Sequence, residues 1–305
     1  MRIENDPVRL HLALFTVALL FSGNYIISKL GMREFSPMSF AWLRIAGAAA
    51  ILAVIVRNEP PLSRDDTRRV AGYAILGVVI NAPLFLVGLS MTSVHVAAIL
   101  ITTIPVFAVA AAIAFGRERA SATRIGGIAL ACVGALLVVG GERFTGTWRS
   151  VLGATLIVIN CLSYALYLVI SKPAMARLSA KRVVARMFLV GTFVLVPFAA
   201  LPMARQDWES LSAGAWLALG VVIIGPTIVA YLLQAWALRH ADSSVVAAYT
   251  YIQPVLASVL GALVLGETLR PIVLGAAVLI FSGVALAGKS GATGSQPADH
   301  RHSTG

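Results

Sequence analysis

Charged residues are scarce in this chain of 305 residues. Asp, Glu, Lys and Arg together make up 12% of it, whereas hydrophobic residues make up 59% and the mean hydropathy is +0.88. A soluble globular protein has about 25% charged and about 45–50% apolar residues. With so little polar surface, the chain is excluded from the water-soluble class, and an integral membrane protein is expected.

Cysteine is also rare, and both cysteines, Cys132 and Cys161, lie within apolar stretches. Two isolated thiols provide neither a disulfide framework nor a set of metal ligands, so we predict no metal and no cofactor. Acidic residues number 13 against 24 basic ones, for a net charge of +11. Because the basic residues form short clusters between apolar runs and no continuous basic face, nucleic acid is not an expected partner.

Long apolar runs make up most of the sequence. Runs of about 18–22 residues are long enough to cross a bilayer as helices. Proline and glycine separate them, for example at Ser36-Pro37 and Gly140-Gly141. The pattern predicts an all-α fold with ten transmembrane helices near residues 10–29, 37–56, 70–90, 94–115, 122–140, 150–171, 184–203, 212–236, 243–265 and 270–288.

The basic residues predict the orientation. If the N-terminus is cytoplasmic, Lys and Arg are about three times as frequent in the inner connections as in the outer ones, as the positive-inside rule requires. Both termini are therefore expected in the cytoplasm. The first run lacks a small-residue cleavage site and carries Asn24 and Lys29, so it is expected to be a retained span.

The sequence contains an internal repeat. Pro105 and Glu118 are 13 residues apart, as are Pro254 and Glu267, and each member of the second pair follows its counterpart by 149 residues. Each half then holds five spans, and an odd number turns the second half upside down in the membrane. We predict two inverted five-helix repeats, residues 1–145 and 146–288, followed by a disordered cytoplasmic tail, residues 289–305. Inverted repeats are typical of transporters, in which two related halves expose a central site to either side in turn.

These features resemble the drug/metabolite transporter superfamily, specifically the EamA-type bacterial exporters, over residues 10–288. The motifs that carry the resemblance are Phe21-Ser22-Gly23-Asn24-Tyr25 with Lys29, Pro37 with Arg44, Ala98 through Pro105 to Glu118, and Ala247 through Pro254 to Gly266-Glu267. The chain departs from the family pattern in having Arg117 before Glu118 and Phe21 where tryptophan is common. The resemblance implies ten helices, a central cavity, a bacterial inner membrane and export of amino acids or related metabolites. Other members of the superfamily carry nucleosides, drugs or sugar phosphates.

A polar stripe on the sixth run predicts one wall of the cavity. Asn160, Tyr164, Tyr167 and Ser171 are spaced 4, 3 and 4 residues apart and so share a helical face. A shift of 143 residues maps this stripe onto Val17, Phe21, Asn24 and Ser28 of the first run, which is the more apolar of the two stripes. We expect both stripes to line the cavity, and a polar seam between helices is the alternative.

Two further runs carry polar or aromatic groups beside a proline. Asn81 and Phe85 flank Pro83 in the third run, and Tyr231 and Gln234 follow Pro226 in the eighth. Proline frees a backbone carbonyl that a polar ligand can use where the helix faces a cavity. These residues are therefore expected to line the cavity as well.

The repeated prolines lie mid-span in the fourth and ninth runs. Polar groups surround them and are expected to bind substrate, namely Thr102, Tyr249 and Gln253. Pro105 and Pro254 are predicted gating bends, together with Pro83 and Pro226, and static kinks are the alternative.

Arg44 is the one charge well inside a span, roughly 10 Å from its outer end at 1.5 Å per residue. It is a candidate for binding a substrate carboxylate, although snorkelling to the interface is equally consistent with its position. Glu118 and Glu267 lie at span ends, where structural caps or interhelical pairs are the expectation.

The expected partner is a small zwitterion, because aromatic rings attract an ammonium group and amides bind a carboxylate. Since no Asp, Glu or His lies near the middle of a span, a facilitator or exchanger is predicted in preference to a proton-coupled pump. Exporters of drugs or quaternary ammonium compounds, or of nucleosides, are the alternatives within transport. An intramembrane enzyme is disfavoured, because no His-Glu-x-x-His, Gly-x-Ser-x-Gly or mid-span aspartate pair is present. Membrane lipid is the other expected partner, and the oligomeric state stays open.

Overall fold

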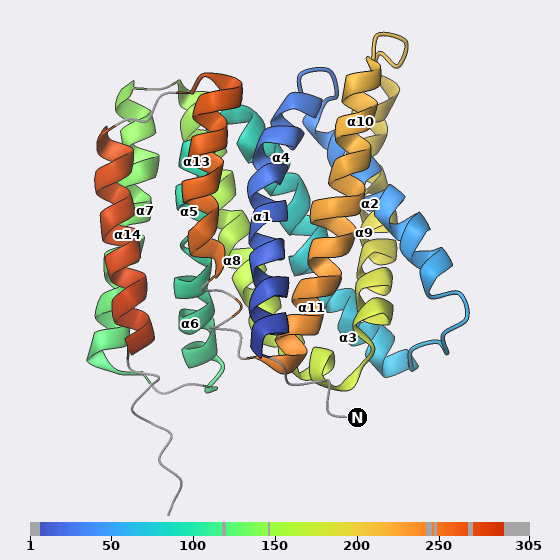
Figure 1. Cartoon of the computed structure of the whole chain (residues 1–305), viewed down its shortest axis with the longest axis horizontal. Helices are drawn as coiled ribbons and strands as arrows, with labels where there is room; N and C mark the ends of the chain where they lie inside the picture. The colour runs from blue at the N-terminus through green and yellow to red at the C-terminus, as the bar shows by residue number, and fades with distance from the viewer. Residues whose placement is uncertain are drawn as a thin grey trace, which may run out of the picture.

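The computed structural model describes residues 7–117, 120–145, 147–241, 246, 249–267 and 271–289. Throughout these residues the regular structure is helical, as predicted (Figure 1). The helices are α1 (Pro7–Gly31), α2 (Pro37–Ile55), α3 (Arg64–Ala74), η1 (Ile75–Ile80), α4 (Asn81–Met91), α5 (Val94–Ile101), α6 (Ile104–Ala114), α7 (Ala122–Thr145), α8 (Trp148–Arg177), α9 (Ala180–Ala204), α10 (Ala213–Val222), η2 (Ile223–Val229), α11 (Ala230–His240), η3 (Tyr249–Tyr251), α13 (Ile252–Leu265) and α14 (Pro271–Lys289).

Each predicted run coincides with one helix or with a stack of consecutive helices. Seven of these units are long and apolar enough to cross a membrane in the described part of the chain. The other three are α7, α13 and α14, so the count of ten spans stays a prediction. Large apolar side chains such as Leu12, Phe193 and Leu263 are more than half exposed on the bundle surface, where lipid would cover them. The predicted tail after Lys289 lies outside the described residues.

Serine side chains define where several helices begin. The Oγ atoms of Ser36, Ser63, Ser93 and Ser212 each accept the N–H of the residue three positions ahead, at 3.1–3.2 Å. An N-cap of this kind satisfies one of the backbone N–H groups that a helix start leaves without a partner. Pro37 follows the first of these caps at a position where a missing N–H costs nothing.

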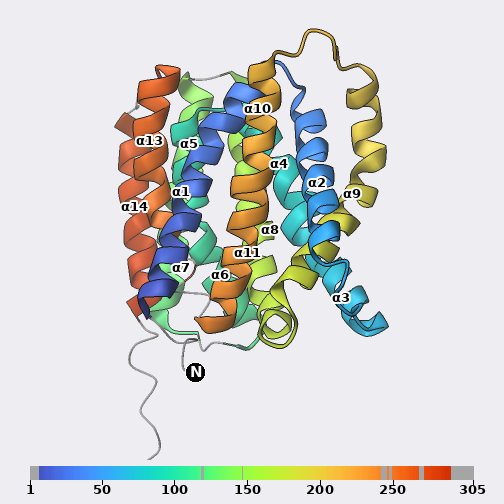
Figure 2. The same ribbon diagram turned by 45° about the vertical axis from the view of Figure 1, so that its right-hand side comes forward.

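The two halves run in opposite directions and interlock. α1 begins at the end of the bundle where the N-terminus lies, whereas α8, its counterpart in the second half, begins at the opposite end (Figures 1 and 2). α1 packs against α11 and α13 of the second half, and α8 packs in the same way against α4 and α6 of the first. The counterparts α2 and α9 contact each other, as do α7 and α14. This exchange of contacts makes the two halves one body with a shared interior.

Two glycines let α4 and α8 approach to backbone contact. A Cβ atom added to Gly153 would lie 2.8 Å from the carbonyl oxygen of Gly88, and a Cβ on Gly88 would lie 2.8 Å from that of Gly153. Small residues at helix crossings permit such packing in membranes, where no hydrophobic force draws the helices together.

We therefore expect Gly153→Ala to lower the free energy of unfolding by about 1–3 kcal/mol, because one helix must move to admit the methyl group. Gly72→Ala in α3 is the matched control, since nothing lies within 4 Å of the added Cβ. It should raise stability by about 0.5–1 kcal/mol through helix propensity. Thermal unfolding of both purified variants in the same detergent measures the difference, and equal midpoints would contradict this account of the crossing.

Candidate functional site

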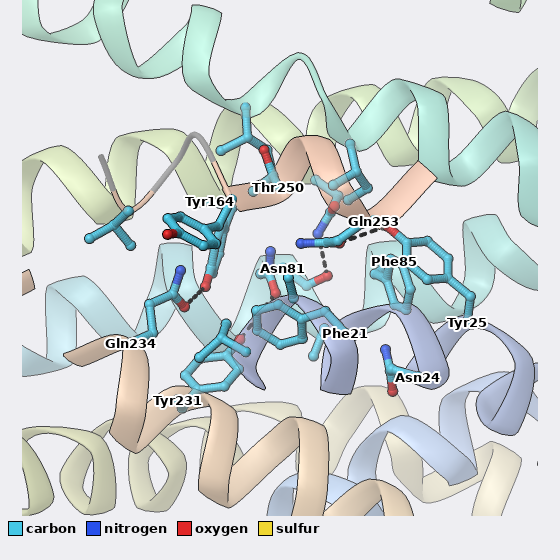
Figure 3. Close-up of a pocket in the computed structure, with 18 of the residues that line it drawn as sticks. Phe21, Asn24, Tyr25, Asn81, Phe85, Tyr164, Tyr231, Gln234, Thr250 and Gln253 are labelled. Carbon is cyan, nitrogen blue, oxygen red and sulfur yellow. Dashed lines mark hydrogen bonds between the residues drawn. The ribbon is translucent and has the colours of Figure 1, made fainter. Parts of the chain in front are cut away.

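A cavity of about 70 Å³ lies between the two halves (Figure 3). Side chains from α1, α2, α4, α8, α11 and the start of α13 form its walls, together with residues at the break between α5 and α6. A cavity needs about 10–15 Å³ to hold one water molecule, so this one has room for several waters or a small metabolite. Its polar lining residues are Asn24, Tyr25, Arg44, Asn81, Asn160, Tyr164, Tyr231, Gln234, Tyr249, Thr250 and Gln253.

The helix on one side of the cavity is irregular beside the repeated proline in each half. α5 ends at Ile101 and α6 begins at Ile104, within the single predicted run at 94–115. In the second half, η3 passes into α13 at Ile252, which is 149 residues after Thr103 and thus the equivalent position. That Pro105 and Pro254 act as gating bends stays a prediction. Pro105 lies in the first turn of α6 and Pro254 is the third residue of α13, where no intrahelical N–H is needed.

Wide π-helical turns form the other irregular backbone at the cavity. η1 precedes Asn81, and η2 lies at the equivalent place in the second half with Pro226 inside it. Such turns leave carbonyl groups without helical partners, and side chains from other helices use them. The Tyr231 hydroxyl donates to the Gly77 carbonyl at 3.1 Å, and the Ser163 hydroxyl donates to that of Leu76 at 2.8 Å.

Arg44 is the one charged residue among the described lining residues, and its side chain is only 5% exposed. Its Nε donates to the Thr227 hydroxyl at 2.6 Å, and its Nη1 lies 3.4 Å from the Asn24 amide oxygen. Within the described part of the chain it pairs with no carboxylate. A guanidinium held only by neutral groups at this depth leaves a positive charge that a bound anion would neutralise.

Hydrogen bonds between helices orient the remaining polar groups. The hydroxyl of Tyr164 donates to the amide oxygen of Gln234, and that of Tyr25 donates to Gln253 at 3.2 Å (Figure 3). Asn160 donates its amide to the Asn81 carbonyl at 2.8 Å. The Oδ1 atom of Asn160 is buried and has no hydrogen-bond partner in the described part of the chain, so it is a free acceptor.

Aromatic rings form the apolar wall. Phe21 and Tyr164 each meet Tyr231 edge to face, with ring centroids 6.4 Å apart in both pairs. Tyr25 and Phe85 meet in the same way at 5.4 Å. Rings in these arrangements present faces and edges that suit different parts of a polar organic molecule.

Ten of the twelve predicted lining residues, Phe85 among them, surround this cavity. The other two, Thr102 and Tyr167, do not line it, and neither do Ser171 and Ser28 at the ends of the two stripes. The Thr102 hydroxyl is occupied by the Ile99 carbonyl at the end of α5, and the Tyr167 ring packs over Gly77. Tyr25 and Thr250 line the cavity but were not predicted to do so. Tyr25 lies directly after Asn24 on α1, and other helices pack against α1 on more than one side.

Comparison with known proteins identifies the fold. The model of the EamA-like transporter family matches residues 9–140 and 151–288. The chain belongs to the EamA-like transporter family. An uncharacterized transporter of Archaeoglobus fulgidus is 26% identical over 84% of this chain and 89% of its own length. The uncharacterized inner membrane transporter YedA of Escherichia coli K12 is 25% identical over 88% of each. One solved crystal structure shares the fold with a TM-score of 0.65 at 19% identity, covering 93% of this chain and 99% of its own.

The resemblance drawn from the sequence is thus confirmed, and the chain is a multi-pass membrane transporter. The two matched segments correspond to two EamA repeats. Membership points to a transporter in preference to an enzyme. Two expectations stay predictions. The first is that the cavity residues bind substrate, and the second is that the four prolines act in gating.

At one end of this EamA bundle, an ion-pair network joins the two halves above the cavity. Glu267, just after α13, bonds to Lys29 Nζ at 2.5 Å and accepts the N–H of Val94 at 2.8 Å. Lys29 also donates to the Thr92 carbonyl at 3.0 Å. His95 Nε2 lies 3.8 Å from the same carboxylate. The structural role expected for Glu267 stays a prediction, and Glu118 lies outside the described residues.

A second contact ties the loops at the same end. The Glu34 carboxylate accepts the backbone N–H of Ser212 at 2.6 Å and its hydroxyl at 2.8 Å. These bonds, the backbone one foremost, hold the pKa of Glu34 below its ordinary value. Contacts between the halves therefore join this end of the bundle. Towards the other end, one contact between His11 and Tyr249 lies near the boundary of the cavity.

Glu267→Gln should lower the free energy of unfolding by about 1–3 kcal/mol, because Lys29 then loses its charged partner at a partly buried position. Glu209→Gln, in the exposed loop at the same end, makes the same chemical change and should have little effect. Thermal unfolding in detergent measures both. In a double-mutant cycle, Lys29→Gln should cost less in the Glu267→Gln background than in the wild type, and simple additivity would contradict the pairing.

Proposed function

We propose that this EamA transporter exports small zwitterionic metabolites, amino acids foremost, across a bacterial inner membrane. The observation that carries the proposal is Arg44, a buried guanidinium at the cavity without a carboxylate partner in the described chain. A substrate carboxylate would neutralise it through the paired N–H groups of the guanidinium.

The aromatic wall suits an ammonium group. The unused Oδ1 of Asn160 accepts an N–H, and the faces of Tyr164 and Tyr231 attract a cation. A molecule with both charges would leave the filled cavity with the same single positive charge as the empty one. The cavity volume of about 70 Å³ favours a small amino acid over a large drug.

Transport by alternating access follows from the two halves and their irregular helices. In the proposed cycle, the ion pair of Lys29 and Glu267 opens while the opposite end closes. Because the described lining residues include no Asp, Glu or His, no group there is suited to carry a proton, and a facilitator or exchanger is proposed. Amino acids would then leave down their own gradient.

The aromatic wall also favours a second candidate, a quaternary ammonium compound or a nucleoside, since both can stack on the rings of Tyr164 and Tyr231. A permanent cation without a carboxylate would, however, meet the like charge of Arg44. This repulsion places amino acids first.

Counterflow in proteoliposomes tests the substrate. Labelled amino acids should exchange against internal unlabelled ones, whereas nucleosides and a lipophilic cation should not. A lipophilic cation exchanging while every amino acid fails would overturn the substrate class. Uptake that needs a proton gradient and collapses with an uncoupler would overturn the facilitator mechanism.

Arg44→Lys should reduce amino-acid exchange by about tenfold or more, because the point charge of lysine cannot bind both carboxylate oxygens in parallel. Arg205→Lys in the exposed α9–α10 connection makes the same change outside the cavity and should leave exchange unchanged. Gel filtration and thermal unfolding check that both variants fold. Equal transport by the two variants would remove Arg44 from the binding site.

The proposed orientation places the α2–α3 connection in the cytoplasm and the α9–α10 connection outside. A membrane-impermeant maleimide applied to whole cells should therefore label Glu209→Cys but not Asn58→Cys, both at exposed positions. Both should react once the membrane is permeabilised. The reverse pattern would invert the orientation.

A further inference from the structure

A second cavity, of about 390 Å³, lies at the end of the bundle where α1 begins. It is enclosed by the end of α2, the connection to α3 and the first turns of α9, which lie together in Figure 2. Its polar walls are Glu59, Thr67, Arg182 and Arg186, and Leu62 and Leu189 belong to its apolar side. It shares no lining residue with the central cavity.

Positive charge exceeds negative charge around this second cavity. Glu59 is shared by two cations, with Arg182 Nε and Lys181 Nζ each 3.5 Å from its carboxylate. The Ser179 hydroxyl donates to the same carboxylate at 3.1 Å, and Arg182 also donates to the Pro60 carbonyl at 2.9 Å. The single carboxylate of Glu59 therefore faces two cations, Arg182 and Lys181, and Arg186 adds a third positive charge.

Arg186 is the cation left over. In the described part of the chain it forms no hydrogen bond and no ion pair, and its Nε atom is buried. The Nε atom of Arg182 is likewise buried without a hydrogen-bond partner. The unpaired guanidinium of Arg186, with that of Arg182 on the same cavity wall, forms a receptor for an anion with several oxygens, and phosphate suits that geometry.

The rest of the wall indicates what the phosphate is attached to. Val56, Leu62 and Leu189 make the cavity apolar on one side, and Ala53 extends that side to the exposed surface of α2. Val54 and Ile55, next to it, are 62% and 46% exposed and belong to the surface that faces lipid. Apolar walls would not contribute to the binding of a free phosphate ion, whereas the glycerol and acyl carbons of a phospholipid would cover them.

We propose that this second cavity binds an anionic phospholipid, with its phosphate at Arg186 and Arg182 and its acyl chains along α2 and α9. Basic pockets between helices at the cytoplasmic surface bind such headgroups. The site joins the first half of the chain to the second, since α2 and α9 are counterparts. It is independent of the transported substrate.

Lipid binding to the purified protein tests the proposal. Native mass spectrometry in detergent, titrated with phosphatidylglycerol, should show one tightly held lipid on the wild-type protein. Arg186→Gln should weaken this binding by about tenfold, because a charge-assisted hydrogen bond is lost. Arg68→Gln removes the same charge from an exposed position at the same end and should change the affinity less than twofold. Arg186→Lys, which keeps the charge, should fall between them.

Two further measurements of thermal unfolding identify the source of the phosphate. Phosphatidylglycerol should raise the unfolding temperature of the wild-type protein and not that of Arg186→Gln, whereas phosphatidylcholine should act equally on both. Equal loss of phosphatidylglycerol in Arg186→Gln and Arg68→Gln would reduce the effect to general surface charge and overturn the site. Protection by inorganic phosphate without protection by phosphatidylglycerol would overturn the lipid assignment. Amino-acid counterflow plays no part in these readouts, so failure of the proposed transport function leaves them unaffected.

Discussion

The structure depends on one constraint, that a backbone N–H or carbonyl in hydrocarbon must find its partner within the protein. Helices meet this requirement by themselves, and irregular backbone is tolerated only where other groups complete it. Both kinds of irregularity occur at the central cavity. At the end of α5, the hydroxyls of Thr102 and Thr103 bond to carbonyls three residues back. At η1, Tyr231 and Ser163 reach across from other helices.

The same constraint explains why the cavity is polar. Every group that completes a broken or widened helix must itself be polar, so these side chains collect where the backbone is irregular. Asn160 illustrates the result, because its amide is used by the Asn81 carbonyl and its oxygen is left for a ligand. The architecture that opens the helices therefore also supplies hydrogen-bonding groups for a substrate.

Charge is distributed by a related rule. A charge at hydrocarbon depth is costly unless it is paired or solvated. Lys29 and Glu267 meet the rule by pairing at one end of the bundle, and Arg44 meets it with neutral oxygens. The proposed substrate would complete the environment of Arg44 in each transport cycle. At the opposite end, Arg186 remains for a ligand from the membrane itself.

The sequence alone determined the helical fold, the family and most of the residues around the central cavity. Apolar runs of membrane length, the repeat of Pro105 and Glu118 at Pro254 and Glu267, and the family motifs determined the helical fold and the family. Helical periodicity also placed ten polar or aromatic residues near a common interior, because a polar group at that depth must face inward. These features depend on spacing along one helix, and spacing is visible in a sequence.

Only the tertiary structure decided how those residues divide between lining the cavity and packing. Thr102 and Tyr167 have the right spacing, but one bonds within its own helix and the other packs over Gly77. The break at 102–103, the 3-10 turn η3 and the π-helical turns were not predicted. At the π-helical turn η1 the freed carbonyls are taken by hydroxyls from other helices, and such long-range partners are not visible in a sequence. The second cavity was likewise not predicted from sequence. Its residues come from α2, α3 and α9, and whether a guanidinium is paired depends on three-dimensional neighbours that no local pattern specifies.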